Sequence, residues 1–272
     1  MSKNSNPEMS LDHREYLRKV KHKKICVFVA QIVIVIVVFA LWELAARLKI
    51  IDPFITSQPS RIVNTIVKLY REGNLIRHIA ITCGETVLGF LFGTLLGTFI
   101  AVILWWSEFL QKVLEPYLII LNSLPKIALG PIFIVWIGAG PLAIVVIAMT
   151  ISIVVTILEV LNGFLGVDND KIKLVKTFGA SKLQVFTKVV LPSSLPVIVN
   201  ALKVSVGLLW VGVIVGEFLV SKEGIGYLIV YGGQVFQLDL VMASVIILSM
   251  AAFLMYRAVA WIERVIIANR NI

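Results

Sequence analysis

Long apolar stretches alternate with short polar ones along this chain of 272 residues. Six of them are close to twenty residues long and nearly free of charge, which is the length that an α-helix needs to cross about 30 Å of hydrocarbon. They cover residues 25–46, 84–106, 113–138, 141–164, 194–220 and 239–262. The pattern therefore predicts an all-α, polytopic membrane protein with six transmembrane helices.

The charges between these spans predict the orientation of the chain. Residues 1–24 form a polar tail with seven lysines and arginines, and basic segments of this kind stay in the cytoplasm. An even number of spans returns residues 265–272 to the same side, so we expect both termini to be cytoplasmic. The loop 165–193 is then also cytoplasmic, and the segment 47–78 is external although it carries several basic residues.

The external segment is expected to contain a short amphipathic helix. Pro59 and Ser60 are typical of a helix start, and Gly73-Asn74 is typical of a helix end. Apolar residues at helical spacing fall on one face: Ile62, Val63, Ile66, Val67 and Tyr70. We expect this helix to lie on the outer membrane surface or to cap the bundle. Contact with solute is the less favoured alternative.

The second span contains a repeat of small residues. Gly89, Gly93 and Gly97 recur every four residues and therefore share one face of the helix. Because glycine has no side chain, another helix can approach closely at this face. We expect tight helix packing there, with a neighbour from the same chain favoured over a second subunit.

The third span is expected to be broken. It contains Pro116, Pro125 and Pro131, and a proline inside a helix removes a backbone donor and kinks the helix. Irregular backbone is tolerated in a membrane where it is buried in protein or lines a cavity. Lys126 at mid-depth is costly in lipid, so it faces such a cavity, pairs with Glu115 or Glu159, or extends toward the interface.

The stretch "DNDKIKLVKTFGASKLQVFTKVVLPSSLP", from residue 168, is a polar loop between two spans. Asp168 or Asp170 is suited to cap a first helix, and Gly179 is suited to end it in the left-handed conformation. Ser181 and Gln184 have the spacing of a capping box at the start of a second helix. The loop is therefore expected to form a helix, a glycine elbow and another helix.

The second helix of the loop is expected to cover residues 181–191, because the residue before Pro192 is pushed out of the α region. Leu183, Phe186 and Val190 fall on one of its faces. A capped helical loop with apolar side chains to bury is typical of a docking surface for a protein partner.

Composition narrows the classes of function further. Hydrophobic residues make up 59% of the chain and the mean hydropathy is +0.96, so we interpret the net charge of +9 as topological and expect no nucleic-acid partner. Cys26 and Cys83 predict neither a disulfide framework nor a metal site. The sequence lacks a phosphate-binding loop and the motifs of hydrolases. We therefore expect this chain to have no catalytic residue and to bind no metal or cofactor.

The loop resembles the cytoplasmic loop of bacterial ABC-importer permeases of the type I, MetI-like fold, whose pattern is EAA-x3-G-x9-I-x-LP. Gly179 stands at the glycine, Val189 at the isoleucine and Leu191-Pro192 at the final pair. "LPKIALGPIFIVWIGAG" and "VGEFLVSKEGIGYLIVYGG" extend the resemblance to permeases for nitrate, sulfonates, taurine and thiamine precursors. The Glu-Ala-Ala is replaced by Lys173, Leu174 and Val175, so no salt bridge of that glutamate is transferred to this chain.

This resemblance implies the place and the partners of the protein. It implies an ABC type-1 transmembrane domain over residues 79–264, in a multi-pass protein of the bacterial cytoplasmic membrane. The implied partners are an ATPase subunit that uses the ATP, an extracytoplasmic solute-binding protein and a second permease copy, as a homodimer. The residues implied to couple to the ATPase are Lys173, Gly179, Ala180, Ser181, Leu183, Phe186, Leu191 and Pro192. The implied solute is a small organic anion such as a sulfonate or taurine, nitrate, or a pyrimidine vitamin precursor.

Candidates for the solute path follow from depth and polarity. They are Asn122, Ser123, Lys126, Trp210 and Glu217. Helix packing or an internal ion pair is the alternative explanation for each of them.

Two other classes of function, an ion-coupled secondary transporter and a membrane-embedded enzyme, are alternatives to an importer subunit. An ion-coupled secondary transporter commonly has interrupted helices at matching positions of two halves, whereas only one span of this sequence is clearly broken. A membrane-embedded enzyme would need a catalytic motif, and this sequence contains none of the motifs considered above.

Overall fold

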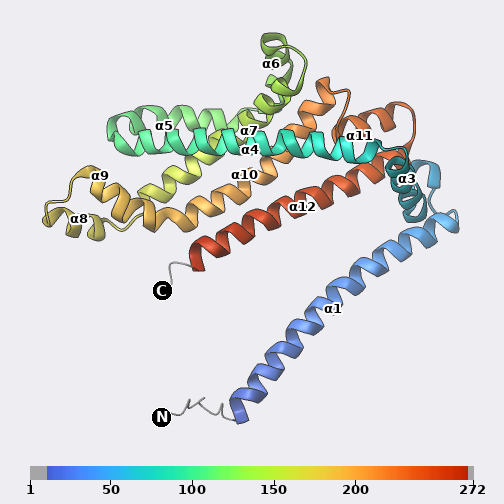
Figure 1. The fold of residues 1–272 in the computed structure, drawn as a ribbon, viewed down its shortest axis with the longest axis horizontal. Helices are drawn as coiled ribbons and strands as arrows, with labels where there is room; N and C mark the ends of the chain where they lie inside the picture. Colours follow the sequence, from blue (N-terminus) through green and yellow to red (C-terminus); the bar gives the residue numbers. More distant parts are fainter. Residues whose placement is uncertain (1–10, 269–272) are drawn as a thin grey trace. The chain divides into compact units, whose positions relative to one another are not determined.

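The computed structural model of the protein describes residues 11–268, in which every regular element is helical (Figure 1). The elements in chain order are α1 (Leu11–Arg47), α2 (Pro53–Thr56), α3 (Pro59–Arg71), α4 (Asn74–Trp106), α5 (Glu108–Ser123), the 3-10 turn η1 (Lys126–Leu129), α6 (Gly130–Ile137), α7 (Pro141–Leu165), α8 (Asn169–Thr177), α9 (Lys182–Val185), the π-turn η2 (Phe186–Val190), α10 (Leu191–Val220), α11 (Ile225–Gln234) and α12 (Leu238–Ala268). In this range five helices are long and apolar enough to cross a membrane, or six if one bent pair counts as a span. The predicted all-α, six-span fold class is confirmed.

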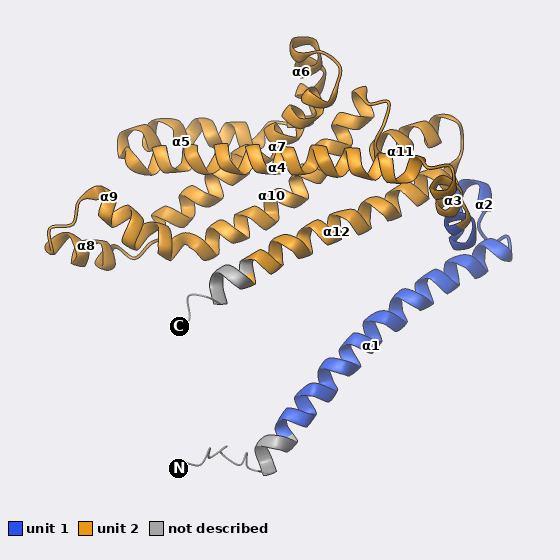
Figure 2. Ribbon diagram, in the orientation of Figure 1, with its two compact units in different colours: residues 1–63 blue, residues 64–272 orange. Residues whose placement is uncertain are grey.

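The chain divides into two compact units, residues 1–63 and residues 64–272 (Figure 2). In the first unit α1 begins at Leu11, so the described part of the basic tail continues the first apolar span as one helix. Glu43 fixes the turn that follows, because its carboxylate accepts hydrogen bonds from Arg47 Nε at 2.8 Å and from Ser60 N and Oγ at 3.0 Å. The short helix α2 is capped by Asp52, whose side chain accepts from Phe54 N at 2.9 Å.

The predicted amphipathic helix is α3, which begins at Pro59 and ends before Gly73. Its residues Ile66 and Leu69 pack against a small cluster that contains Ile225 of α11 and Ile247 of α12. The remainder of the predicted apolar face is different, since Val63, Val67 and Tyr70 are exposed. The helix therefore caps the bundle through part of the expected face and leaves the other part open.

The central helix of the second unit is α7, which packs against both α4 and α10. The glycine face of α4 lies on it, because Cβ atoms added at Gly89, Gly93 and Gly97 would contact Ala148, Ser152 and Thr156 at 3.0 to 3.7 Å. These three partners also recur every four residues, so two ladders of small side chains face each other. The neighbour at the glycine face is thus a helix of the same chain.

The same small residues of α7 also lie close to α10. A Cβ atom added at Gly212 would lie 2.5 Å from Ala148 Cα, which leaves no room for a side chain. Thr156 Oγ1 and Ser205 Oγ form a buried hydrogen bond of 2.7 Å between the two helices. Close backbone contact and buried hydrogen bonds are what hold helices together in lipid, where apolar surface alone gives no driving force.

The third span is broken as predicted, and the break lies at one proline. Helix α5 and the segment Lys126–Ile137 meet at an angle of 87° around Leu124 and Pro125. Pro116 lies inside an uninterrupted α5, and Pro131 lies in the first turn of α6, where a missing N–H group costs nothing. The predicted break of the span is confirmed and lies at Pro125, whereas Pro116 lies within α5 and Pro131 lies in the first turn of α6.

Candidate functional site

The loop between α7 and α10 forms the predicted helix, elbow and second helix. Asp168 caps α8, since its side chain accepts from Asp170 N at 2.9 Å. Gly179 follows α8 with a φ of 79°, the left-handed conformation that L side chains avoid. Ser181 and Gln184 form the predicted capping box, with Ser181 N donating to Gln184 Oε1 at 2.8 Å and Gln184 N donating to Ser181 Oγ at 3.3 Å.

The second helix of the loop does not end at Leu191, which corrects the prediction made from Pro192. The chain is helical without interruption from Lys182 to Val220. Residues 186–190 widen into a π-turn in which Leu191 N donates to the carbonyl of Phe186. A proline normally clashes with the carbonyl four residues earlier, and a wider turn is one of the ways in which a helix accommodates it. The second helix of the loop and the transmembrane helix α10 are consequently one continuous helix.

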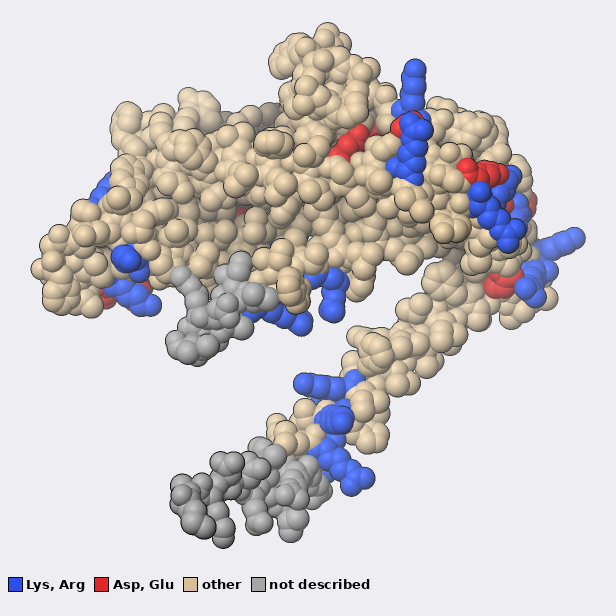
Figure 3. Space-filling view, in the orientation of Figure 1, with Lys and Arg blue, Asp and Glu red and all other residues tan. Residues whose placement is uncertain are grey.

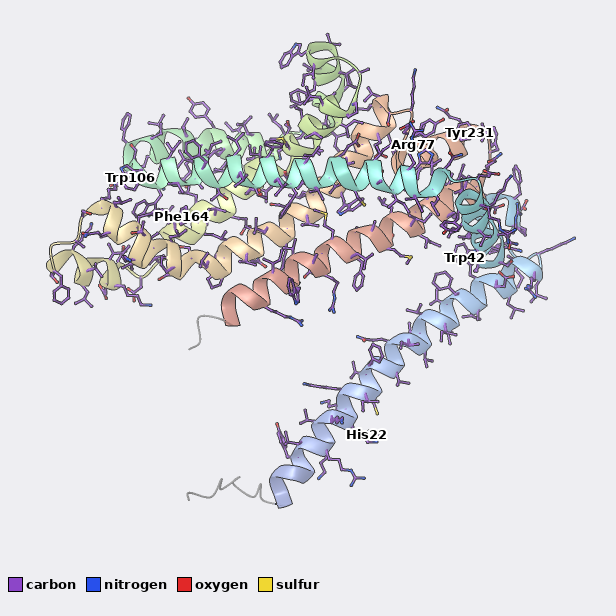
Figure 4. All side chains as sticks on the ribbon, in the orientation of Figure 1. His22, Trp42, Arg77, Trp106, Phe164 and Tyr231 are labelled. Atoms are coloured by element: carbon purple, nitrogen blue, oxygen red, sulfur yellow. The ribbon has the colours of Figure 1, made fainter. Side chains whose placement is uncertain are left out.

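Phe186 lies inside the protein and not on the surface of the loop. Its ring packs against Trp105, Trp106 and Phe164, with centroid distances of 4.9, 6.2 and 5.4 Å. Figure 4 labels Trp106 and Phe164, which lie at the end of the second unit where α8 and α9 are found. Val190, on the same predicted face, is also buried. Two of the three residues of the expected apolar face thus join the loop to the core, whereas Leu183 is exposed.

Lys182 fastens the loop to the end of α4. Its Nζ donates to the carbonyl of Trp106 at 2.6 Å and lies 5.8 and 5.7 Å from the ring centroids of Trp105 and Trp106. The carbonyl groups in the last turn of a helix lack partners within the helix and carry partial negative charge. The lysine therefore caps α4 electrostatically and connects two elements that are far apart in sequence.

The exposed large apolar side chains of α8, α9 and the elbow between them are Leu174, Phe178 and Leu183, with exposed fractions of 58%, 83% and 59%. We call these three residues the apolar patch. Sequence reasoning selected only Leu183 of the three, because it followed the motif positions and not the exposed side of the two helices. Figure 3 shows that most of the second unit is uncharged on the face in view, so the ends of the bundle, where the loops lie, carry much of its charge.

The remaining predicted coupling residues are placed in several ways. Lys173 Nζ forms an exposed ion pair with Asp170 Oδ1 at 3.2 Å. Ala180 and Leu191 are half-buried and pack against the core cluster under the loop. Pro192 is half-buried in the first turn of α10. These side chains shape the loop or lie on its polar surface, whereas the apolar patch is exposed.

Of the five candidates for the solute path, the structure brings three together at the break in the third span. Lys126 Nζ donates to the carbonyl of Asn122 at 2.9 Å and lies 3.5 Å from Asn122 Oδ1. Ser123 Oγ donates to the carbonyl of Ile119 at 3.0 Å. Among residues 11–268 no ion pair joins Lys126 to Glu115 or Glu159, so the pairing that the sequence suggested is not formed.

The other two candidates, Trp210 and Glu217, are buried on α10. Glu217 accepts from Thr82 Oγ1 at 2.6 Å and from Gly226 N at 2.5 Å, and Thr82 Oγ1 in turn accepts from Ile225 N at 2.8 Å. Gly224 has a φ of 107°, and a Cβ atom there would lie 2.4 Å from the Glu217 carboxylate. Glu217 therefore ties the start of α11 to α4 and α10.

Sequence reasoning missed Glu85, which lies in contact with Glu217. Its side chain is only 5% exposed although it stands in the second predicted span. A carboxyl group inside an apolar helix is itself a sign of function or of specific pairing, and that sign was available in the sequence.

Comparison with known proteins identifies the family. Residues 93–268 match the family described as binding-protein-dependent transport system inner membrane component. The chain belongs to this family and is a multi-pass permease of the inner membrane.

Several characterised or named permeases resemble most of the chain. The putative aliphatic sulfonates transport permease SsuC of Bacillus subtilis is 29% identical over 86% of this chain and 85% of its own length. The formylaminopyrimidine transport permease ThiX of Halalkalibacterium halodurans is 27% identical over 87% of this chain and 94% of its own. The taurine permease TauC of Escherichia coli is 22% identical over 84% and 85%.

A solved structure shares the fold. A chain of the MetNI methionine ABC transporter, in an inward-facing conformation, superposes with a TM-score of 0.64 over 72% of this chain and 97% of its own length. The identity of 22% supports the fold alone. The MetI-like architecture expected from the loop motif is confirmed.

Proposed function

We propose that this chain is the permease subunit of an ATP-driven importer and that its loop 165–193 docks a separate ATPase subunit. The observation that carries the proposal is the apolar patch Leu174, Phe178 and Leu183, held by capped helices at the tip of the loop. Exposed apolar side chains on a rigid polar loop favour contact with another protein. The helix that bears Leu183 continues into α10, so movement of the partner is passed directly into the membrane.

The division of labour follows from this arrangement. Closure of two ATPase subunits on ATP draws the two loops of a permease dimer together, and each loop moves its own α10. ATP is bound and hydrolysed by the partner. This chain supplies the solute path and the loop that moves α10. Both termini and the loop lie in the cytoplasm in this proposal, and the α11 end of the second unit faces an external solute-binding protein. The permease pairs with a second copy of itself.

The solute is proposed to be small and polar. The named permeases that this chain resembles carry aliphatic sulfonates, taurine and formylaminopyrimidine. These names support a sulfonate, taurine or a pyrimidine precursor as the class of solute, while nitrate is proposed from the resemblance of the sequence motifs alone.

Co-purification tests the docking surface. The permease is expressed with its cognate ATPase and purified in mild detergent. We expect Phe178→Asp to abolish co-elution of the ATPase, because it places a charge at a residue that is 83% exposed at the tip of the loop. Tyr70→Asp is the matched control, since it alters an aromatic residue of α3 that is 62% exposed and lies outside the loop. Co-elution with Phe178→Asp and Leu183→Asp alike would contradict the proposal, and ATP-independent uptake driven by an ion gradient would favour a secondary transporter.

A further inference from the structure

The start of α1 carries a ring of basic side chains on the helix that continues into the first apolar span. Five cations fall within seven residues: Arg18, Lys19, Lys21, Lys23 and Lys24. We call these five residues the basic collar. The sequence pattern predicts a polar tail here, whereas the structure places these side chains on α1 itself. Figure 3 shows basic side chains gathered along this part of α1.

The basic collar lies at the depth of the lipid headgroups. The apolar part of α1 begins at Ile25, and about twenty helical residues from there reach across about 30 Å of hydrocarbon. Arg18 lies seven residues before Ile25, which is about 10 Å along the helix. The polar layer on each side of a bilayer is about 5–8 Å thick. The collar therefore occupies this layer from the edge of the hydrocarbon outward.

The cations of the collar point to every side of the helix. At 3.6 residues per turn the seven residues make about two turns, and no gap between neighbouring cations around the axis exceeds about 100°. Residues 21–41, which include most of the collar and the apolar stretch after it, are all exposed. A protein partner contacts one face of a helix, whereas lipid headgroups can contact all of its faces. The arrangement therefore fits a lipid surface better than a docked subunit.

The positive charge of the collar is not balanced within the described part of the helix. Residues 16–42 contain no aspartate or glutamate. Among the described side chains, no carboxylate forms an ion pair with Lys21, Lys23 or Lys24. The other end of α1 is different, because Arg47 Nε pairs with Glu43 Oε1 at 2.8 Å. One end of the helix therefore has an excess of cations that an anionic surface can neutralise.

An open hollow of about 510 Å³ runs along one side of α1 where the collar meets the apolar span. Its wall is formed by Val20, Lys23, Lys24, Val27, Phe28 and Gln31. Because these positions recur at intervals of three and four residues, they share one face of the helix. Two ammonium groups therefore lie directly above apolar side chains that face the hydrocarbon. This order of groups matches a phospholipid, whose phosphate lies above the start of its acyl chains.

We propose that the basic collar binds the headgroups of anionic phospholipids and holds them around the start of α1 in the folded protein. Clusters of four or more cations next to a membrane span attract anionic lipids, and each cation near the surface adds to the attraction. This contact goes beyond the topological role of the charges, because it persists after insertion is complete. It is also independent of the proposed function as an importer subunit, since it concerns α1 alone.

Fluorescence quenching by brominated lipids measures which lipid lies beside the collar. The full chain carries a fluorophore on Cys26, which is exposed just inside the apolar span, and Cys83→Ala removes the other thiol. The protein is reconstituted in vesicles that contain brominated phosphatidylglycerol or brominated phosphatidylcholine at increasing mole fraction, in 50 mM NaCl. We expect phosphatidylglycerol to reach half-quenching at about one fifth of the mole fraction that phosphatidylcholine needs. A factor of about five is what a single cation near the surface gives.

Charge variants assign this preference to the collar. Lys21→Gln, Lys23→Gln and Lys24→Gln together should reduce the preference below about twofold, whereas arginine at the same three positions should retain it, because the charge is kept. The matched control removes three exposed lysines from the loop 165–193, by Lys171→Gln, Lys176→Gln and Lys188→Gln, and leaves the preference unchanged.

Salt provides a test that needs no charge variant and so does not depend on how a variant inserts. In 1 M NaCl the screening length falls to about 3 Å, and the preference for phosphatidylglycerol should disappear. Equal quenching by the two lipids in 50 mM NaCl, or a preference that survives in the glutamine variant or in 1 M NaCl, would overturn the proposal. Stronger displacement by inorganic phosphate than by NaCl at equal ionic strength would overturn it too, because the collar would then be a site for a small free anion.

Discussion

Replacement of Phe186 by alanine tests the buried part of the loop 165–193 independently of its exposed apolar patch. The ring is 8% exposed and contacts three other aromatic rings, two of them at the end of α4 and one in α7. Truncation of a buried phenylalanine to alanine costs about 3–5 kcal/mol. We therefore expect a lower midpoint of thermal unfolding, by about 6–20 °C if the scale of soluble domains of similar size applies.

The functional effect should differ from that of the exposed patch. Since Phe186 does not reach the surface, Phe186→Ala still co-elutes with the ATPase, but stimulation of ATP hydrolysis by the loaded binding protein is lost because the loop is no longer fixed to α4 and α7. Phe178→Asp shows the reverse, with an unchanged midpoint of unfolding and no co-elution. Thermal unfolding, co-elution and stimulated ATPase activity are measured on both variants. Normal stimulation by Phe186→Ala, or loss of ATPase binding with a normal midpoint, would refute the reasoning.

Three further predictions test single contacts. Gly179→Val should insert normally yet lose solute-stimulated ATPase activity, because the left-handed conformation costs a branched residue about 1–2 kcal/mol, while Gly179→Asn retains it; unchanged turnover of the valine variant would contradict this. Gly97→Leu should lower the free energy of unfolding by about 1–3 kcal/mol, because a Cβ atom there already lies 3.0 Å from Thr156. A Cβ atom at Gly84 has no neighbour within 4 Å, so Gly84→Leu should leave the midpoint of thermal unfolding unchanged. Thr82→Val should cost about 1–3 kcal/mol by leaving Glu217 and Ile225 N with a lost partner, and Thr82→Ser should restore most of it; equal midpoints for the valine variant and the wild type would exclude the network as a stabilising one.

Local chemistry explains which parts of the fold were predictable. The caps of the loop depend on residues a few positions apart, so Asp168, Gly179 and the pair Ser181 and Gln184 could be assigned from spacing alone. The break at Pro125 and the glycine face of α4 were likewise encoded in short patterns, although the partner of that face became visible only with α7 in place.

The failures have a common physical origin in contacts between distant segments. The rule for the residue before a proline predicts a helix end at Leu191, but it does not include the π-turn at residues 186–190, where Phe186 and Val190 are buried in the core. The exposure of Phe178 could not be read from its apolar character, which predicts burial. Glu85 is different, since its charge within a span was visible and only its contact with Glu217 required coordinates.

The uninterrupted helix from Lys182 to Val220 has 39 residues and is therefore about 58 Å long at the usual rise per residue. Leu183 stands near its first end and Glu217 near its last, so one helix bears both the proposed ATPase contact and the carboxyl group that accepts from Gly226 N. Under the proposed function, a displacement at the Leu183 end is transmitted through the π-turn at residues 186–190 to the Glu217 end along one continuous helix. Docking of the ATPase at one end and rearrangement of the contacts of Glu217 at the other would then both follow from a single tilt of this helix.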